Sequence, residues 1–366
     1  MADKQSIVRG CLLGMAVGDA MGYTVDGSSW PQIQMDYGPN GLLGYDLVNG
    51  YADVTSYTQL AAFACNGLLL GMTRGQMQGK MAPLVRYVAL AEREWAQSQR
   101  YRGDPGKTFC WVTRTPELTG RRCMDTMMLD TLSRERLGTP EEPTNRFNSP
   151  SGLTSAVAVG LFSDPGRLGR EESDRLGAEV VALTHGNPAT FLSGAVLSHL
   201  VGSLCRSPET DLSILLQLAV DAVQIQFGRQ YPQLDDVLEL LRMAKILANS
   251  DSVGQVDAME QLHCKTAPEV LAGALYACMV CGDDFDSAMI TAVNHSGRSA
   301  AVGAVTGALL GAKLGEEALP DFYLECLEPA GILRELADDM AQGCPMDWGS
   351  CMFDDDWDRK YVHGGK

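Results

Sequence analysis

Two runs of glycine at every fourth position constrain the fold of this chain more than any other feature. A spacing of four residues is close to one helical turn, so the glycines of each run lie on one face of a helix. Each interior glycine destabilises a helix by about 1 kcal/mol relative to alanine, and a run of them therefore implies a closely packed neighbouring backbone. The two runs are Gly10, Gly14, Gly18 and Gly22, and Gly303, Gly307, Gly311 and Gly315. We expect both helices to be central, and tight helix packing is sufficient to explain the glycines.

The rest of the chain has the apolar period of helices, and the alternation typical of strands is nearly absent. Apolar residues recur at intervals of three and four in ten segments, which predicts an all-α fold. The segments are 6–22, 55–71, 82–97, 171–185, 188–205, 211–226, 233–248, 268–281, 284–294 and 298–315. The stretches 23–54 and 99–150 are richer in glycine, proline and polar residues and are predicted as long loops. A helical bundle of this length can bury one large core, so we expect a single domain over residues 1–366.

The charge of the chain excludes two classes of partner. Its formal net charge is -17, and an acidic surface repels both phosphate backbones and anionic membrane surfaces. Residues 1–9 contain no apolar signal core, and no uncharged apolar run approaches the roughly 20 residues needed to span a bilayer. We therefore expect a cytoplasmic protein with neither nucleic acid nor a membrane as its partner.

Three blocks of sequence resemble the ADP-ribosylglycohydrolases, the family that includes dinitrogenase-reductase-activating glycohydrolase and the eukaryotic ADP-ribosyl hydrolases. The first block, Gly10-Cys-Leu-Leu-Gly-Met-Ala-Val-Gly-Asp-Ala-Met-Gly22, is similar to the opening helix of that family. The second is Leu183-Thr-His-Gly-Asn-Pro188, and the third is the run 283–320. The blocks stand in the family's order, and the resemblance covers about residues 6–325, which leaves 326–366 as a C-terminal closing segment.

The resemblance implies both a fold and a chemistry. The implied fold is an ADP-ribosylglycohydrolase-like orthogonal helical bundle with a cleft between helix ends. The implied chemistry is hydrolysis of an N- or O-glycosidic bond to ADP-ribose, with two Mg²⁺ ions in the cleft. Mg²⁺ takes near-octahedral oxygen ligands at about 2.1 Å, so several carboxylates must converge from different helices. Such ions position ribose hydroxyls and activate water at a sugar carbon with oxocarbenium character.

The first metal motif of the family is altered in this chain. In the family it reads Thr-Asp-Asp-Thr followed by Gln and an apolar residue, and the best register here is Thr55-Ser-Tyr-Thr-Gln-Leu60. Ser56 and Tyr57 thus stand in the two aspartate positions. Ser56 is compatible with a weak metal ligand or a helix cap, whereas a phenol with a pKa of about 10 is a poor magnesium ligand at neutral pH. An alternative register makes Asp53 a metal ligand, but it displaces the following Gln-Leu pair by three residues.

The second metal motif is altered as well. It reads Gly-Asp-x-Asp-Thr in the family and stands here as Gly297-Arg-Ser-Ala-Ala301, so Arg298 and Ala300 replace both carboxylates. A permanently charged guanidinium repels a dication and can take over part of its electrostatic role. With Ser56 and Tyr57 also degenerate, we expect no metal cofactor, and Mg²⁺ only if an altered site remains active.

Two carboxylates survive beside these motifs and are the candidate catalytic residues. Asp26 stands where the family usually has a glutamate, and Asp19 lies beside a glycine of the first run. The alternative interpretation of Asp19 is a buried carboxylate that braces a neighbouring backbone segment. His185 is interpreted as a core histidine rather than a catalyst, since a neutral imidazole needs only one donor and one acceptor.

The candidate ligand-binding residues come from the two altered motifs and from the residues just before the second one. They are Ser56, Tyr57, Asn294, His295 and Arg298. Asn294 and His295 lie about one turn before Arg298, at the mouth of the implied cleft. The resemblance implies an ADP-ribose-like small molecule, or an ADP-ribosylated or ADP-ribosylating protein, as the partner.

Three functions remain open, and whether the chain is an enzyme at all depends on which of them holds. The first is a degenerate hydrolase that keeps the cleft and binds such a ligand without fast turnover, because a guanidinium suits a pyrophosphate or carboxylate. The second is an active ADP-ribosyl hydrolase with an altered or single-metal site built from Asp19, Asp26 and Asp53. The third is a structural or partner-binding protein on this fold, since fold does not determine function.

Overall fold

Helices make up almost all the regular structure of the part of the chain that the computed structural model describes, residues 3–101, 103–104, 106–123, 125–164, 166–346 and 352–365. These residues form 18 α-helices and three short 3-10 helices, and their extended pairing is limited to two isolated β-bridges. The first half contains α1 (Lys4–Tyr23), α2 (Trp30–Tyr37), α3 (Ser56–Gln78), α4 (Leu84–Arg100), η1 (Trp111–Arg114), α5 (Pro116–Thr119), α6 (Thr126–Leu132), η2 (Pro150–Gly152), α7 (Ser155–Phe162) and α8 (Arg170–Ala182). The second half contains α9 (Pro188–Arg206), α10 (Leu212–Phe227), α11 (Leu234–Ala248), α12 (Gln255–Gln261), α13 (Ala267–Cys281), α14 (Phe285–Val293), α15 (Ser299–Leu314), η3 (Glu316–Ala318), α16 (Asp321–Leu324), α17 (Ala330–Gln342) and α18 (Asp355–Tyr361).

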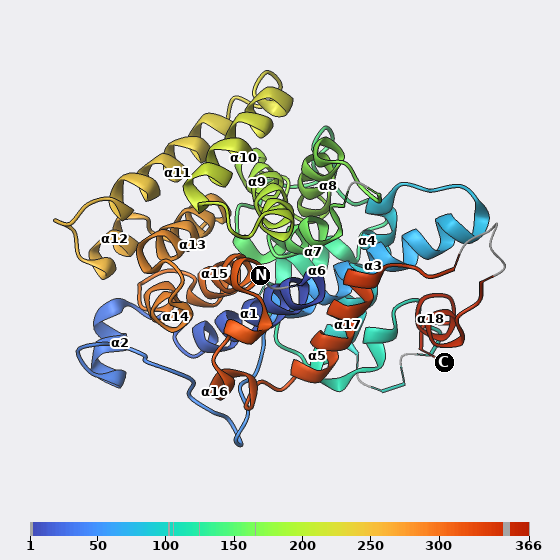
Figure 1. The fold of residues 1–366 in the computed structure, drawn as a ribbon, viewed down its shortest axis with the longest axis horizontal. Helices are drawn as coiled ribbons and strands as arrows, with labels where there is room; N and C mark the ends of the chain where they lie inside the picture. Colours follow the sequence, from blue (N-terminus) through green and yellow to red (C-terminus); the bar gives the residue numbers. More distant parts are fainter. Residues whose placement is uncertain are drawn as a thin grey trace.

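The two glycine-rich helices, α1 and α15, lie against each other near the middle of the molecule (Figure 1). They run antiparallel, because Gly10 faces Gly311 and Gly18 faces Gly303. A Cβ atom built on Gly18 would lie 1.9 Å from the carbonyl oxygen of Gly303, a distance that no side chain tolerates. The expectation of two central, closely packed helices is therefore confirmed. Gly315 differs from the others of its run, since it ends α15 with a φ of 82°.

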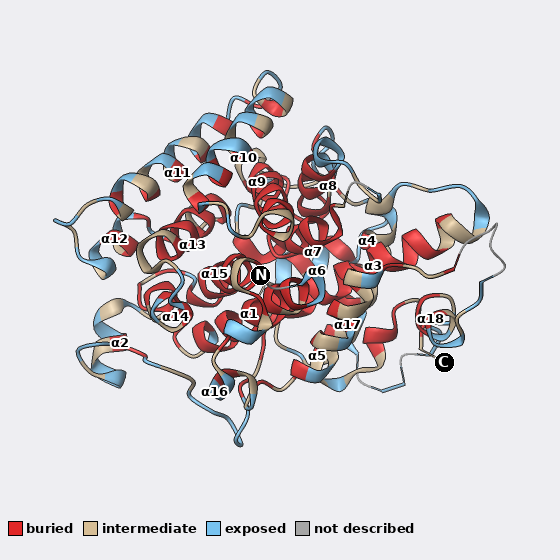
Figure 2. Cartoon of the chain, viewed as in Figure 1, coloured by how far each residue is buried: buried red, intermediate tan, exposed pale blue. Residues whose placement is uncertain are grey.

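Burial decreases from this central pair outward. Nearly every residue of α1 and α15 is buried, whereas α10 and α11 present exposed outer faces (Figure 2). One described helix, α9, is long and apolar enough to cross a membrane by composition alone. Its 18-residue apolar window is 83% buried inside the structure, as in a core helix of a globular protein.

All ten segments predicted from the apolar period are helices. Nine agree in their bounds to within three residues, and α3 continues seven residues past its predicted end, to Gln78. The loop predictions for 23–54 and 99–150 are wrong in part, because α2 lies in the first stretch and the short helices η1, α5 and α6 lie in the second. Pro31 and Pro116 stand in the first turns of α2 and α5, where proline is favoured and its missing N–H costs nothing. The all-α prediction is confirmed, whereas the prediction of a single domain over the whole chain stays a prediction.

Candidate functional site

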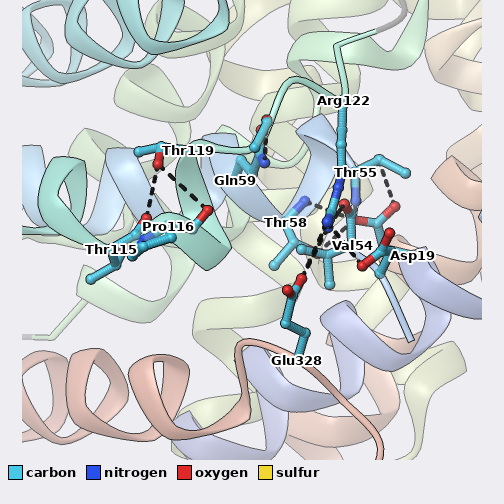
Figure 3. Close-up of polar contacts among 12 residues, drawn as sticks. Asp19, Val54, Thr55, Thr58, Gln59, Thr115, Pro116, Thr119, Arg122 and Glu328 are labelled. Carbon is cyan, nitrogen blue, oxygen red and sulfur yellow. Dashed lines mark hydrogen bonds and ion pairs between the residues drawn. The ribbon is translucent and has the colours of Figure 1, made fainter. Parts of the chain in front are cut away.

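The start of α3 is held by a carboxylate from α1. Asp19 is fully buried, and it accepts hydrogen bonds from the backbone N–H and the hydroxyl of both Thr55 and Thr58, at 2.6–3.1 Å. Figure 3 shows these four contacts below the first turn of the helix. A carboxylate at this end of a helix satisfies N–H groups that have no partner inside the helix and interacts favourably with the helix dipole.

The same contacts define the ionisation of Asp19. Burial raises its pKa, and the hydrogen bonds from Thr55 and Thr58 lower it in part, which leaves the pKa at about 6. Four donors of the protein surround the Asp19 carboxylate, so its position corresponds to the bracing role that the sequence left open. The geometry favours a structural rather than a catalytic role for this residue.

Asp53, the alternative metal ligand, is paired with a cation. Its carboxylate lies 2.9 Å from the guanidinium of Arg122, which also lies 3.2 Å from Glu328. Arg122 also donates a hydrogen bond to the carbonyl oxygen of Val54, one residue before the helix cap (Figure 3). This cluster ties the entry of α3 to the loop between α16 and α17, and it holds Asp53 in an ion pair.

The start of α15 is held by the second surviving carboxylate. Asp26 lies in the turn after α1, and its Oδ1 accepts a hydrogen bond from the N–H of Ala300 at 3.1 Å. Its Oδ2 lies 3.3 Å from Nη1 of Arg298, whose side chain is 47% exposed. Burial raises the pKa of Asp26, and the contacts with Ala300 and Arg298 offset only part of that increase.

Tyr57 lies in the first turn of α3 and is largely buried. Its N–H donates a hydrogen bond to the hydroxyl oxygen of Thr55, and its carbonyl oxygen accepts one from the hydroxyl of Thr154 at 2.7 Å. Burial raises the pKa of its hydroxyl well above the usual value, with Asp26 adding to the increase and Arg298 opposing it. The charges of Asp26 and Arg298 thus act on the Tyr57 phenol in opposite directions. We call the ion pair of Asp26 and Arg298 the Arg298 cluster.

Ser56 is buried at the first position of α3, and its hydroxyl lies beside the thiol of Cys123. Burial raises the pKa of that thiol to about 12, and the Ser56 hydroxyl lowers it slightly. Ser56 thus belongs to the same helix start as Tyr57 but faces a neutral thiol.

Asn294 and His295 are bonded to the backbone of the protein. The amide of Asn294 accepts a hydrogen bond from the N–H of Leu42 at 2.8 Å and donates one to its carbonyl oxygen at 2.9 Å. His295 is buried, with Nε2 donating to the carbonyl oxygen of Ala292 and Nδ1 accepting from the N–H of Gly297. Burial lowers the pKa of His295 to about 4, so the ring is neutral. The geometry favours structural roles for both residues rather than the ligand contacts predicted for them.

A hydroxyl-rich cluster beside Tyr57 was not predicted. Asp125 accepts hydrogen bonds from the hydroxyls of Ser149 and Ser151, each at 2.8 Å, and Ser149 also contacts Nε2 of His185 at 2.8 Å. Burial raises the pKa of Asp125, but the hydrogen bonds from its neighbours lower it by more, so this carboxyl is ionised at neutral pH. It also contributes to the raised pKa of Tyr57. The run Asn-Ser-Pro-Ser-Gly at residues 148–152 is the local signal for the serines, whereas nothing local marks Asp125.

His185 is a buried histidine of the core, as the sequence predicted. It is fully buried, and its Nδ1 accepts a hydrogen bond from the hydroxyl of Thr184 at 2.8 Å while Nε2 donates to Ser149. One donor and one acceptor satisfy a neutral imidazole.

The donors at the two helix starts do not fit a dinuclear magnesium centre. Both oxygens of Asp26 face hydrogen-bond donors, one of them a guanidinium, and Asp19 is enclosed by four donors. Mg²⁺ needs several oxygen ligands that point their lone pairs at one position. Within the described part of the chain, no three His, Cys, Asp or Glu side chains converge in an arrangement that holds a metal. We derive no metal-dependent step for this site, and the expectation of no metal cofactor stays a prediction.

Comparison with known proteins adds a family and a fold. The family model for ADP-ribosylglycohydrolase matches residues 1–349. Among solved structures, the chain is similar to a chain described as an ADP-ribosylglycohydrolase-related protein complex, with a TM-score of 0.53 and 21% sequence identity over 93% of this chain and 99% of that chain. At this identity the likeness shows the fold. No curated protein matches.

Proposed function

This chain belongs to the ADP-ribosylglycohydrolase family, and on that premise we propose that it is a degenerate hydrolase. It retains a site for ADP-ribose-like or ADP-ribosylated ligands and does not hydrolyse them rapidly. The proposal combines a shared fold with a changed set of charged groups at the helix starts, where the family's motifs supply metal ligands.

The single observation that carries the proposal is the ion pair between Arg298 and Asp26 at the start of α15. In the family's motif the position of Arg298 holds a carboxylate for a metal ion, and here it holds a permanent cation. A guanidinium interacts with a pyrophosphate through paired N–H groups and needs no metal to do so. The positive charge at this position is thus supplied by the chain itself.

The neighbourhood of Arg298 supports an anionic ligand. Its side chain is half-exposed, and only its Nη1 is bonded to Asp26, which leaves further N–H groups for an incoming anion. The first turn of α15 adds the partial positive charge of a helix start, which favours phosphate groups. The Tyr57 phenol adds no negative charge, because burial keeps its pKa well above neutrality.

Calorimetric titration with ADP-ribose tests the proposal. We expect measurable binding by the wild type and at least about tenfold weaker binding by Arg298→Ala, a loss of about 1.4 kcal/mol. Arg100→Ala is a matched control, since Arg100 also forms an exposed pair with an aspartate, Asp130, and lies on α4 outside the cluster. An absence of heat with the wild type, or binding undiminished in Arg298→Ala, would refute the proposal.

A further inference from the structure

We propose that the segment between α2 and α3 presents a docking surface for a protein partner that has an apolar contact face and a rim of lysine and arginine. This inference rests on the proposed function in one respect, since the partner is taken to be a basic protein that carries ADP-ribose. The surface consists of the exposed apolar side chains of residues 35–51, together with Phe322 on α16.

The first support is the concentration of exposed apolar side chains in this segment. Six of the 17 large hydrophobic side chains exposed in the described residues lie within residues 35–51. They are Met35, Tyr37, Leu43, Leu47, Val48 and Tyr51, which are 37–74% exposed. Single exposed apolar residues are ordinary, but such a concentration is typical of an interaction site.

The second support is that this segment is ordered by contacts with the body of the protein. Figure 1 shows it in blue, running from α2 past α16. Asn294 holds the backbone of Leu42 by two hydrogen bonds, and Ala52 pairs with the loop after α16 through a hydrogen bond of 2.8 Å to Cys326. Between these two attachments, the ring of Tyr45 packs edge-on against Tyr323, with centroids 5.1 Å apart. A surface that is ordered before binding loses less conformational entropy on binding.

The exposed tip of the segment is a tight hairpin. Val48 and Tyr51 exchange backbone hydrogen bonds of 3.0 and 3.1 Å, and the two residues between them, Asn49 and Gly50, have φ values of 55° and 85°. Two consecutive positive φ values are typical of the turn that Asn-Gly forms between paired strands. The hairpin fixes the exposed side chains of Val48 and Tyr51 relative to each other.

The surface adjoins the start of α3 at its C-terminal end and α16 at its other edge. The segment leads through Val54 into the start of α3, where Ser56 and Tyr57 lie. At the other edge, Phe322 packs against Tyr323 with ring centroids 4.4 Å apart, and Tyr323 contacts Tyr45. A partner seated on this surface would therefore lie beside the start of α3, where Ser56 and Tyr57 lie.

The charge of the surface determines the kind of partner. Residues 27–53 and 320–331 contain six acidic residues and no lysine or arginine. Two of the six, Asp53 and Glu328, pair with Arg122. The other four are exposed and form no ion pair within the described part of the chain; they are Asp36, Asp46, Asp321 and Glu325. An acidic rim attracts a basic protein and repels both an anionic membrane and a second copy of this acidic chain.

The test compares three probes in the same binding assay: free ADP-ribose, a core histone mono-ADP-ribosylated on arginine, and the same histone unmodified. The substitution Leu47→Asp/Val48→Asp places two charges on the docking surface. The matched control is Ile214→Asp/Leu218→Asp, which charges two equally exposed apolar residues on the outer helix α10. Circular dichroism of all three proteins checks that each is folded.

We expect the wild type to bind the modified histone at least about tenfold more tightly than free ADP-ribose, since two linked contacts act together. Leu47→Asp/Val48→Asp loses that difference and keeps the wild-type affinity for free ADP-ribose, and the α10 variant behaves as the wild type. Equal affinity of the wild type for modified histone and free ADP-ribose overturns the docking surface. Wild-type affinity of Leu47→Asp/Val48→Asp for the modified histone also overturns the docking surface.

Two further outcomes separate this inference from the proposed function. If free ADP-ribose does not bind while unmodified histone binds through Leu47 and Val48, the proposed function fails and the docking surface stands. If size-exclusion chromatography shows a dimer that Leu47→Asp/Val48→Asp dissociates, the occupant is a second copy, and the inference of a basic partner is overturned.

Discussion

The guanidinium of Arg298 lies 3.3 Å from the carboxylate of Asp26, so that the surviving acid offsets part of the positive charge at the start of α15. The N–H of Ala300 donates a hydrogen bond to the other oxygen of the same carboxylate. Asp26 is thus turned toward the protein's own donors. It moderates the charge of Arg298, and each of its oxygens accepts a hydrogen bond from the protein.

This arrangement predicts whether one substitution at Asp26 strengthens or weakens the binding of ADP-ribose. Asp26→Asn removes the negative charge beside Arg298 and keeps an oxygen for the Ala300 N–H, so we expect ADP-ribose to bind a few-fold more tightly than to the wild type. A few-fold change in affinity is about 1 kcal/mol. Calorimetry measures the change directly. Weaker binding in Asp26→Asn would instead identify Asp26 as a ligand contact and contradict the structural interpretation.

A second prediction concerns magnesium. Because the donors at the helix starts do not fit the ion, we expect Mg²⁺ or Mn²⁺ to leave the melting temperature unchanged, since only an ion that binds the folded state stabilises it. We also expect no release of free ADP-ribose from arginine-linked or serine-linked substrates when either ion is added. The measurements are thermal denaturation and chromatography of the released nucleotide. Metal-dependent release would establish an active hydrolase with an altered site.

A third prediction tests the packing of the central helices. Gly18→Ala places a methyl group 1.9 Å from the carbonyl oxygen of Gly303, and the two backbones must separate to accommodate it. We expect a loss of about 3 kcal/mol in the free energy of unfolding, measured in urea. Gly331→Ala is the control, because its Cβ would meet no atom within 4 Å in α17, and we expect it to be neutral or stabilising. Equal stability of the two variants would show that α1 and α15 can separate without a loss in the free energy of unfolding.

A fourth prediction uses a buried acid outside the site. Burial raises the pKa of Glu92 to about 8, and the hydroxyl of Ser155, which donates to it at 2.6 Å, opposes this only in part. In the folded protein the acid keeps its proton up to about pH 8, whereas the unfolded chain releases it above pH 4.5. The stability that this group contributes is therefore complete below pH 4.5 and is lost as the pH rises toward 8.

Glu92→Gln mimics the neutral acid and tests that linkage. We expect the difference in unfolding free energy between the variant and the wild type to grow from pH 5 to pH 8, reaching a few kcal/mol in favour of the variant. Urea unfolding at a series of pH values measures this difference. A difference independent of pH would show that Glu92 is ionised in the folded protein.

Among these features, the helices and their central pair were predictable from the sequence because their causes are local. An apolar residue at every third or fourth position determines a helix and the face that it buries, and glycine at every fourth position exposes backbone wherever that helix packs. The short helices α2 and α5 were missed because one or two turns carry too few residues to show a period. Their proline-marked first turns are a weaker local signal.

The sequence by itself determined the family, the all-α fold and the paired glycine helices, and it led us to predict that carboxylates are lost at Ser56, Tyr57, Arg298 and Ala300. Only the tertiary structure decided what the remaining groups do. It placed Asp19 under the start of α3, turned Asp26 toward Arg298, and gathered Asp125 and His185 beside Tyr57. The reason is that the role of a carboxylate depends on which donors surround it. Those donors come from segments up to 274 residues away, a separation that no local pattern records.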